Sequence, residues 1–244
     1  MIVVIWDIPV FMKLFKDLLL SVVIPIYNEE KTLANIVSHV EQVTFVEKEI
    51  ILIDDCSKDT SPQILRRLEK EKGYKVIYHK KNTGKGGALR SGFSLATGDY
   101  VIVQDADLEY DPQDYKILLN ELDKGDFKVI YGSRFMGDYK DMLSLYYIGN
   151  KVLTILANLL FGQSLTDMET CYKLIPIDVI KKVDIKSMRF NFEPEITAKI
   201  LKMGYKIKEV PISYAGRTHK EGKHITWKDG FSALWTLIKF RFVD

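Results

Sequence analysis

The stretch TGDYVIVQDADLEYDP, residues 97–112, decides the fold that this sequence predicts. Its apolar run at residues 100–103 predicts a buried strand of a parallel sheet. Acids follow at alternate positions, and Pro112 then signals the start of a helix; the acids are Asp105, Asp107, Glu109 and Asp111. Acids this close together cannot all pair cheaply with protein groups, but they can share a hard divalent cation, which prefers oxygen ligands. An Asp-x-Asp pair alone is more often a solvated turn, so the rest of the chain has to decide.

The bulk composition is that of an ordinary globular protein. With 244 residues, of which 47% are hydrophobic, the chain can form one large α/β domain. A net charge of +2 argues against nucleic acid as the main partner. Cys56 and Cys171 are too few for a disulfide framework or a zinc site, so we expect both to be reduced, as in a cytoplasmic protein.

Strand-like and helix-like patterns alternate from residue 18 to about residue 132. We expect strands at residues 18–26, 49–53, 75–78, 100–103 and 128–131, with helices between them, the first of which Asn28 would cap. This order predicts βαβ units and a twisted, mostly parallel sheet flanked by helices. Ligands of such sheets bind outside the carboxyl ends of the strands, where residues 25–29, 54–55, 105–109 and 132–134 all fall. We therefore expect one polar edge.

The glycine-rich segment at residues 84–92 lacks the spacing of a phosphate-binding loop. We expect a tight turn that lets a helix pack close to the sheet, with Lys85 exposed. In the alternative, Lys85 and the amides of the helix N-terminus help to hold an anion.

Three segments lie outside the alternating pattern. Residues 1–17 are an apolar arm, interrupted by Asp7 and Pro9, for which a signal peptide is not expected but a strand and a membrane contact both stay open. Residues 143–161 predict a helix with one apolar face, and no stretch reaches the ~20 apolar residues of a membrane span. Residues 213–230 suggest a mobile loop. An amphipathic helix within residues 227–244 would then dock on the main domain, residues 18–226, or lie at a membrane interface.

Several motifs, taken in order, resemble one enzyme family. They are VVIPIYNEE (22–30), IDDCSKDT (53–60), DAD (105–107), GSRF (132–135), TDMETCYK (166–173) and R-x4-GK (217–223). Together they resemble family 2 glycosyltransferases of the GT-A fold, in particular the polyprenyl-phosphate (dolichyl-phosphate) mannose or glucose synthases. The resemblance implies a Rossmann-like α/β sheet with a C-terminal helical extension. It runs from about residue 18 to residue 230.

The resemblance also implies how a nucleotide sugar, GDP-mannose or UDP-glucose, would bind. The positions that match the nucleoside site are Pro25, Tyr27, Glu29, Ile53 and Asp55, and Ala106 would line the nucleotide, with Lys85 near it. Asp105 and Asp107 match the metal-binding pair, and Glu109 a third ligand, for Mg²⁺ or Mn²⁺. The catalytic set would be Asp107 with the basic residues Arg134, Arg217 and Lys223, which match contacts to the donor diphosphate and the acceptor phosphate.

The acceptor is less well defined than the donor. A phosphate acceptor, with a second pKa of ~6, is already an anion at neutral pH and needs cations rather than a base. A saccharide hydroxyl would need a carboxylate base, for which Asp167, Glu169 and Glu193 are candidates, although we slightly prefer for them a role in capping and in positioning Arg or Lys. Cys171 replaces a glycine that many relatives have, and residues 220–223 also depart from their pattern. Both departures concern the acceptor side.

Three alternatives to a polyprenyl-phosphate sugar transferase stay open. One is transfer to a saccharide hydroxyl. A second is a sugar nucleotidyltransferase, although that enzyme would need a glycine-rich, basic first loop in place of residues 25–30. A third is a non-catalytic nucleotide-sugar-binding module. If the acceptor is a lipid, we expect peripheral contact with the cytoplasmic face of the membrane through residues 1–17, 143–161 or 231–242.

Overall fold

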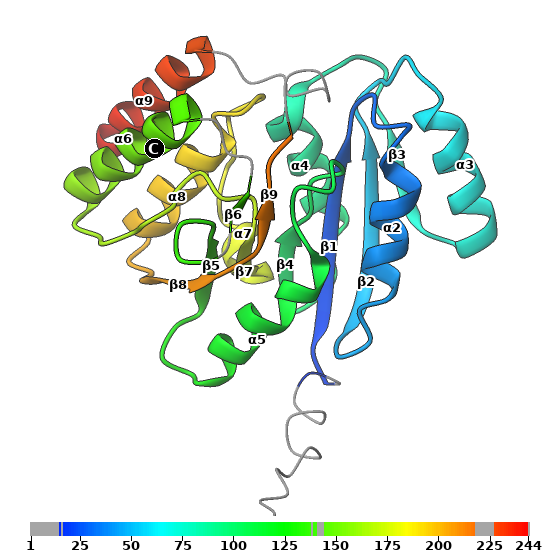
Figure 1. Cartoon of the computed structure of the whole chain (residues 1–244), viewed down its shortest axis with the longest axis horizontal. Coiled ribbons are helices and arrows are strands. Elements are labelled where there is room, and N and C mark those ends of the chain that lie inside the picture. Colours follow the sequence, from blue (N-terminus) through cyan, green and yellow to red (C-terminus); the bar gives the residue numbers. More distant parts are fainter. Residues whose placement is uncertain (1–14, 16, 138, 141–143, 218–226, 244) are drawn as a thin grey trace, which may run out of the picture.

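The computed structural model describes residues 15, 17–137, 139–140, 144–217 and 227–243. Within this part of the chain, seven strands form one sheet in the order β3-β2-β1-β4-β7-β5-β8 (Figure 1). The strands are β1 (Leu19–Ile26), β2 (Glu47–Asp54), β3 (Lys75–Tyr78), β4 (Tyr100–Val103), β5 (Val129–Ser133), β7 (Lys173–Pro176) and β8 (Ile207–Pro211). All neighbours pair in parallel except β7, which runs antiparallel to both β4 and β5. The predicted mostly parallel α/β fold is confirmed.

Helices cover the sheet, and three further helices are grouped at one end of the molecule (Figure 1). They are α2 (Leu33–Glu41), α3 (Ser61–Lys72), α4 (Gly84–Leu95), the 3₁₀ turn η1 (Pro112–Asp114), α5 (Tyr115–Asp123), α6 (Ser144–Phe161), α7 (Ile177–Ile180), α8 (Phe192–Lys202) and α9 (Trp227–Phe242). Helix α4 packs on β1 and β2, and α5 packs on β5 and β8. Helices α6, α8 and α9 contact one another and form the helical extension. None of the described helices combines the length and the apolar character that crossing a bilayer requires.

The sheet centre is buried on both faces, as its sequence predicts. Val22, Val23 and Ile24 in β1 have no exposed surface, which is the burial expected of a parallel strand with helices on both sides. Helix α4 approaches this strand closely at Gly92, where an added Cβ would lie 2.4 Å from Val23 Cγ1. The expectation that the glycine-rich segment lets a helix pack close to the sheet holds at this position.

Two local predictions are wrong. Asn28 does not cap a helix, because α2 begins at Leu33 after Thr32, and Asn28 instead adopts a φ of 56° in the turn after β1. The expected loop at residues 213–230 is also structured at both ends. Tyr214–Ala215 forms strand β9, which pairs in parallel with β6 (Tyr139–Lys140). At the other end, the helix expected within residues 227–244 is present as α9, which begins at Trp227 and packs on α6 and α8.

Of the predicted arm at residues 1–17, the structure describes only Phe15 and Asp17. The Phe15 side chain is buried in the hydrophobic core. The remainder of the arm lies outside the described residues, as do residues 218–226 of the predicted loop.

Candidate active site

An acidic turn follows β4 at the carboxyl edge of the sheet. Leu108, within this turn, has a φ of 62°, and the Glu109 amide donates to Asp107 Oδ1 at 3.1 Å. Burial, together with the nearby Asp105 and Glu109 carboxylates, raises the pKa of Asp107 to about 7. The ionised form of Asp107 is therefore disfavoured by the neighbouring carboxylates. A cation bound at this turn would relieve that repulsion.

Arg217 joins this turn to the loop after β1. Its Nη2 lies 3.1 Å from Glu29 Oε1 and 3.1 Å from Asp107 Oδ2, and its Nη1 donates to Glu29 Oε2 at 3.2 Å. Residues 188 positions apart thus meet at one edge. The predicted convergence of residues that follow β1 and β4 is present in the structure.

Lys85 is not exposed, contrary to the expectation from sequence. Its Nζ lies 2.8 Å from Asp105 Oδ1 and 2.8 Å from Glu193 Oε1, and only 14% of its side chain is accessible. Burial alone would lower the pKa of Lys85, but the two carboxylates raise it well above its ordinary value. Lys85 therefore stays charged beneath the acidic turn.

The glycines at the start of α4 accommodate a neighbouring loop. A Cβ on Gly84 would lie 2.4 Å from the Met188 carbonyl oxygen, and one on Gly86 2.3 Å from that of Ser187. The Gly87 amide donates to the Met188 carbonyl at 3.1 Å. This end of α4 is therefore occupied by residues 187–189, which agrees with a packing role and not with a phosphate cradle.

Asp55, which follows β2, caps α4. Its carboxylate accepts from the Thr83 amide at 2.8 Å, from the Gly84 amide at 2.7 Å and from His79 Nδ1 at 2.8 Å, and the side chain is buried. These bonds use the amides that a helix leaves unpaired at its N-terminus. A contact between Asp55 and a nucleoside stays a prediction.

Arg134 and Asp167 form a buried pair with two parallel hydrogen bonds. Arg134 Nε and Nη2 donate to the Asp167 carboxylate oxygens at 2.7 Å each, and the Arg134 amide adds a bond of 3.0 Å. Asp167 is thus committed to positioning Arg134, the kind of role that the sequence slightly favours for it. Such paired geometry is the strongest form of carboxylate–guanidinium contact.

Glu109 is held by protein groups in this structure. Its oxygens accept from the Tyr214 hydroxyl and from the Arg217 amide, both at 2.7 Å. Among the residues described, no three His, Cys, Asp or Glu side chains are arranged to hold a metal ion. The three-carboxylate set of Asp105, Asp107 and Glu109 stays a prediction. Two adjacent carboxylates nevertheless fit Mg²⁺ or Mn²⁺, which commonly takes few protein ligands and completes its shell with waters and substrate phosphates.

The other predicted site residues differ in accessibility. Tyr27 is 39% exposed at the end of β1, beside the half-buried Pro25, and offers an aromatic surface. The Ile53 side chain is fully buried and Ala106 is nearly so, so Ile53 can meet a ligand only through its backbone. Lys223 lies outside the described residues.

Sequence reasoning missed the polar support beneath the acidic turn. Gln104, fully buried, accepts hydrogen bonds from the Tyr115 hydroxyl at 2.7 Å and the Tyr172 hydroxyl at 2.6 Å. Its Nε2 donates to the Asp105 carbonyl at 3.0 Å. In the sequence, Gln104 directly follows the apolar strand at residues 100–103. A polar amide at that position was the signal that could have indicated a buried hydrogen-bonding group.

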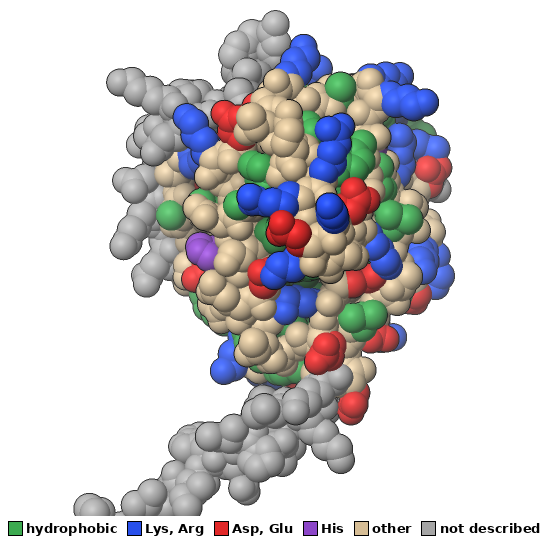
Figure 2. Space-filling model, turned by 90° about the vertical axis from the view of Figure 1, so that its right-hand side faces the viewer, with side chains coloured by type: hydrophobic (Ala, Val, Ile, Leu, Met, Phe, Trp, Pro, Cys, Tyr) green, Lys and Arg blue, Asp and Glu red, His purple; other side chains and the backbone are tan. Residues whose placement is uncertain are grey.

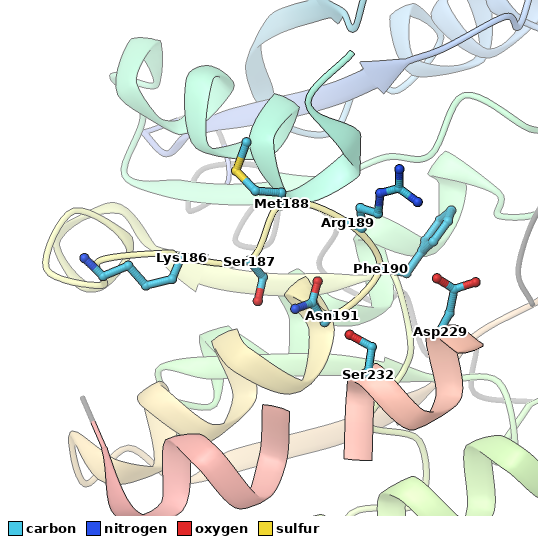
Figure 3. Close-up of a pocket in the computed structure, with 8 residues that line it drawn as sticks. All are labelled: Lys186, Ser187, Met188, Arg189, Phe190, Asn191, Asp229 and Ser232. Carbon is cyan, nitrogen blue, oxygen red and sulfur yellow. The ribbon is translucent and has the colours of Figure 1, made fainter. Parts of the chain in front are cut away.

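A cavity of about 390 Å³ lies beside this site, between residues 186–191 and the start of α9. Figure 3 shows Arg189, Phe190 and Asp229 on one side of it and Lys186 on the other. None of the acidic-turn residues lines it. The cavity is lined in part by residues 187–189, the loop that packs on the start of α4, and is distinct from the acidic turn.

The α/β sheet thus carries an acidic pair at its carboxyl edge, with Lys85 bound to Asp105 and Arg217 bound to Asp107. Residues 21–184 match the family model described as "Glycosyl transferase family 2". The chain belongs to that family.

Relatives of known sequence support this assignment. An uncharacterized protein of Methanocaldococcus jannaschii, MJ1222, is 30% identical over 89% of this chain and 90% of its own length. An undecaprenyl-phosphate 4-deoxy-4-formamido-L-arabinose transferase of Edwardsiella ictaluri is 28% identical over 84% of this chain, but the match spans only 62% of that longer protein.

Solved structures share the fold at low sequence identity. The glucosyl-3-phosphoglycerate synthase of Mycobacterium tuberculosis, in its complex with Mn²⁺ and UDP-glucose, matches with a TM-score of 0.74 and 16% identity. The match covers 98% of this chain and 84% of that one. The similarity establishes the GT-A architecture of the sheet.

Proposed function

We propose that this protein transfers a hexose from a nucleotide sugar to a polyprenyl phosphate, with inversion at the anomeric carbon and with a divalent metal ion. One observation carries the choice of acceptor. Asp167, a candidate base for a hydroxyl acceptor, is buried and bound through both oxygens to Arg134. With this candidate base bound to a cation, the arrangement suits an acceptor that is already an anion and needs no base.

The proposed reaction is a single displacement. A phosphate oxygen of the acceptor attacks the anomeric carbon and forms the new C–O bond, while the bond to the diphosphate breaks and its electron pair leaves with the nucleoside diphosphate. Asp105 and Asp107 would hold Mg²⁺ or Mn²⁺, which supplies charge neutralisation of the leaving diphosphate. Arg217, close to Asp107, and Arg134 would bind and orient the two anionic groups.

The relatives support both substrates of this proposal. The name of the Edwardsiella enzyme specifies undecaprenyl phosphate, and the Mycobacterium enzyme was crystallised with Mn²⁺ and UDP-glucose. We propose GDP-mannose or UDP-glucose as the donor. The exposed Tyr27 ring and the Glu29 carboxylate, after β1, are the groups available to the nucleoside.

An exposed apolar surface on α6 and α9 supports a lipid acceptor. On α6, Leu159 is 78% exposed and Ile148, Val152 and Ile155 lie on the same side; on α9, Trp235 is 65% exposed. Lys239 and Arg241 lie in the last turn of α9. By contrast, Figure 2 shows another face, where acidic and basic side chains alternate and hydrophobic ones are scattered. We propose that the α6–α9 surface contacts the cytoplasmic face of the membrane.

The test is a panel of nucleotide sugars with Mn²⁺ and a short polyprenyl phosphate, scored for lipid-linked sugar. We expect Asp107→Asn to lower kcat by ~100-fold or more, because removing one electrostatic contact in a buried site has effects of that size. Asp111→Asn is the matched control, since the Asp111 side chain caps η1 by accepting from the Gln113 amide. Full activity of Asp107→Asn, with its fold intact by circular dichroism, would refute the role of this carboxylate.

One observation favours a second candidate, transfer to a saccharide hydroxyl. Glu193 is paired with Lys85, but Glu169 Oε1 is buried and accepts no hydrogen bond from any described residue. A carboxylate oxygen that accepts no hydrogen bond could serve as a base. Sugar acceptors that outcompete polyprenyl phosphate in the same assay would establish this second function.

A further inference from the structure

Glu169 lies in the loop before β7, and charged groups from several neighbouring elements influence its carboxyl group. They are Glu193 from α8, Lys173 from β7, Arg134 after β5, and Asp167 from its own loop. Its Oε1 is buried and has no hydrogen-bond partner among the described residues. A buried oxygen in this state is costly unless a ligand or a water satisfies it.

The carboxylates nearest to Glu169, counted together with Glu169 itself, outnumber the nearest cations by one. The buried cations are Lys85, Arg134 and Lys173, and the carboxylates around them are Asp105, Asp167, Glu169 and Glu193. Three of these four carboxylates accept an ion pair from Lys85 or Arg134, while Lys173 donates to the Thr170 carbonyl. Glu169 is the carboxylate that has no ion pair of this kind. Burial, and then the Glu193 carboxylate, raise the pKa of Glu169 to about 8.

The sheet order places Glu169 beyond the acidic turn, away from the proposed nucleoside site. The nucleoside residues follow β1 and β2, the acidic turn follows β4, and β7 and β5 come next in the sheet. Glu169 precedes β7, and Arg134 follows β5. Both therefore lie on the side of the acidic turn opposite the proposed nucleoside site, which is where we place the acceptor.

We propose that Glu169 acts in its protonated form, as a hydrogen-bond donor that positions the acceptor phosphate, and not as a general base. This inference rests on the proposed phosphate acceptor. An ionised Glu169 would repel a phosphate dianion, whereas a neutral carboxyl can donate to one of its oxygens. Glu169 is in this sense a positioning residue that works beside Arg134.

The test compares Glu169→Gln with Glu169→Ala. Glutamine is neutral, of the same size, and still a donor, so we expect Glu169→Gln to stay within a few-fold of wild type. Glu169→Ala should raise the KM for polyprenyl phosphate ~10- to 100-fold, the range expected on losing a hydrogen bond to a charged group, with little change in the donor KM.

The pH profile provides a second readout. If the proton on Glu169 is required, wild-type kcat/KM for the acceptor falls as pH rises through about 8, and Glu169→Gln lacks that decline. A base at this position would give the opposite result, with activity rising through the same range and Glu169→Gln as inactive as Glu169→Ala. Either of those results overturns the proposal.

A neighbouring residue controls for loop packing. Thr170 Oγ1 is also buried and has no hydrogen-bond partner among the described residues, so Thr170→Val changes the same loop without removing a carboxyl. We expect Thr170→Val to keep the wild-type KM for polyprenyl phosphate. If Thr170→Val raises this KM as much as Glu169→Ala does, the effect comes from loop packing and the proposal is overturned. Failure of the proposed function can be told apart from failure of the Glu169 proposal. In the first case the wild-type protein itself would glycosylate a saccharide and not polyprenyl phosphate.

Discussion

Three described residues other than glycine have a left-handed backbone, and each lies in a loop after a central strand. They are Asn28 after β1, Cys56 after β2 and Leu108 after β4, with φ values of 56°, 63° and 62°. For a residue with a side chain this conformation costs ~1 kcal/mol or more, least for Asn. Such outliers gather at functional sites. Here they turn the chain sharply at the edge where Glu29, Asp55 and Asp107 lie.

Cys56 offers a direct test of this backbone strain. Because β-branched side chains fit the left-handed region poorly, Cys56→Val should lower the free energy of unfolding by ~1–2 kcal/mol. Cys56→Gly should not lower it, since glycine adopts this φ without steric cost. Urea unfolding measures both, and Cys56→Ala is the control that keeps a Cβ while removing the thiol. Equal stability of the Val and Gly variants would show that the loop relaxes.

At the scale of single elements, α4 is the best example of a helix fixed by its N-terminal end. Asp55 caps its N-terminus from β2, and Lys85 in its first turn reaches Asp105 and Glu193. Residues 187–189 cover the same end. Helix α4 thus connects the loops after β2 and β4 with the start of α8.

Removing the cap should weaken the whole domain. We expect Asp55→Ala to lower the free energy of unfolding by ~2 kcal/mol, the upper range for a helix cap, because its bonds to Thr83, Gly84 and His79 are all buried or half-buried. Asp111→Ala is the control, since it removes the exposed cap of η1. An unchanged midpoint for Asp55→Ala in the ligand-free protein would show that this cap does not stabilise the domain.

The elements themselves could be predicted because their signals are local. The strand expected at residues 75–78 is β3, and the others agree within a few residues. The burial of Lys85 could not be predicted, because it depends on the contact between α4 and a loop about 100 residues later. The Arg134–Asp167 pair likewise joins two segments 33 residues apart. A sequence pattern shows which residues carry charge, but not which charges neutralise one another.

At the scale of the whole molecule, Glu49 ties the amino edge of the sheet together. It accepts from Ser21 in β1 and from Lys75 in β3, both at 2.6 Å, and from the Thr97 amide before β4 at 2.6 Å. Burial acts to raise the pKa of Glu49, but the hydrogen bonds from Lys75, Ser21 and Thr97 outweigh it and lower the pKa to about 2. The folded protein therefore binds this proton more weakly than the unfolded chain.

This difference predicts how stability depends on pH. The contribution of Glu49 is fully present above its unfolded pKa of ~4.3 and is lost as pH falls through about 2. Glu49→Gln should thus be less stable than wild type at pH 7, with the difference shrinking between pH 4 and pH 2. Thermal unfolding across this range measures it, with the exposed Glu47→Gln as control. A difference that is independent of pH would point to lost packing.

The close fit at Gly84 and Gly86 has a consequence for how this sequence can vary. A side chain at either position would meet backbone oxygens of residues 187–188 at 2.4 Å or less, and backbone cannot move aside as a flexible side chain can. In a saturation library selected for folding alone, without any substrate, both positions should therefore retain glycine. An alanine at either position should survive only together with an insertion, a deletion or another compensating change in the loop at residues 186–191.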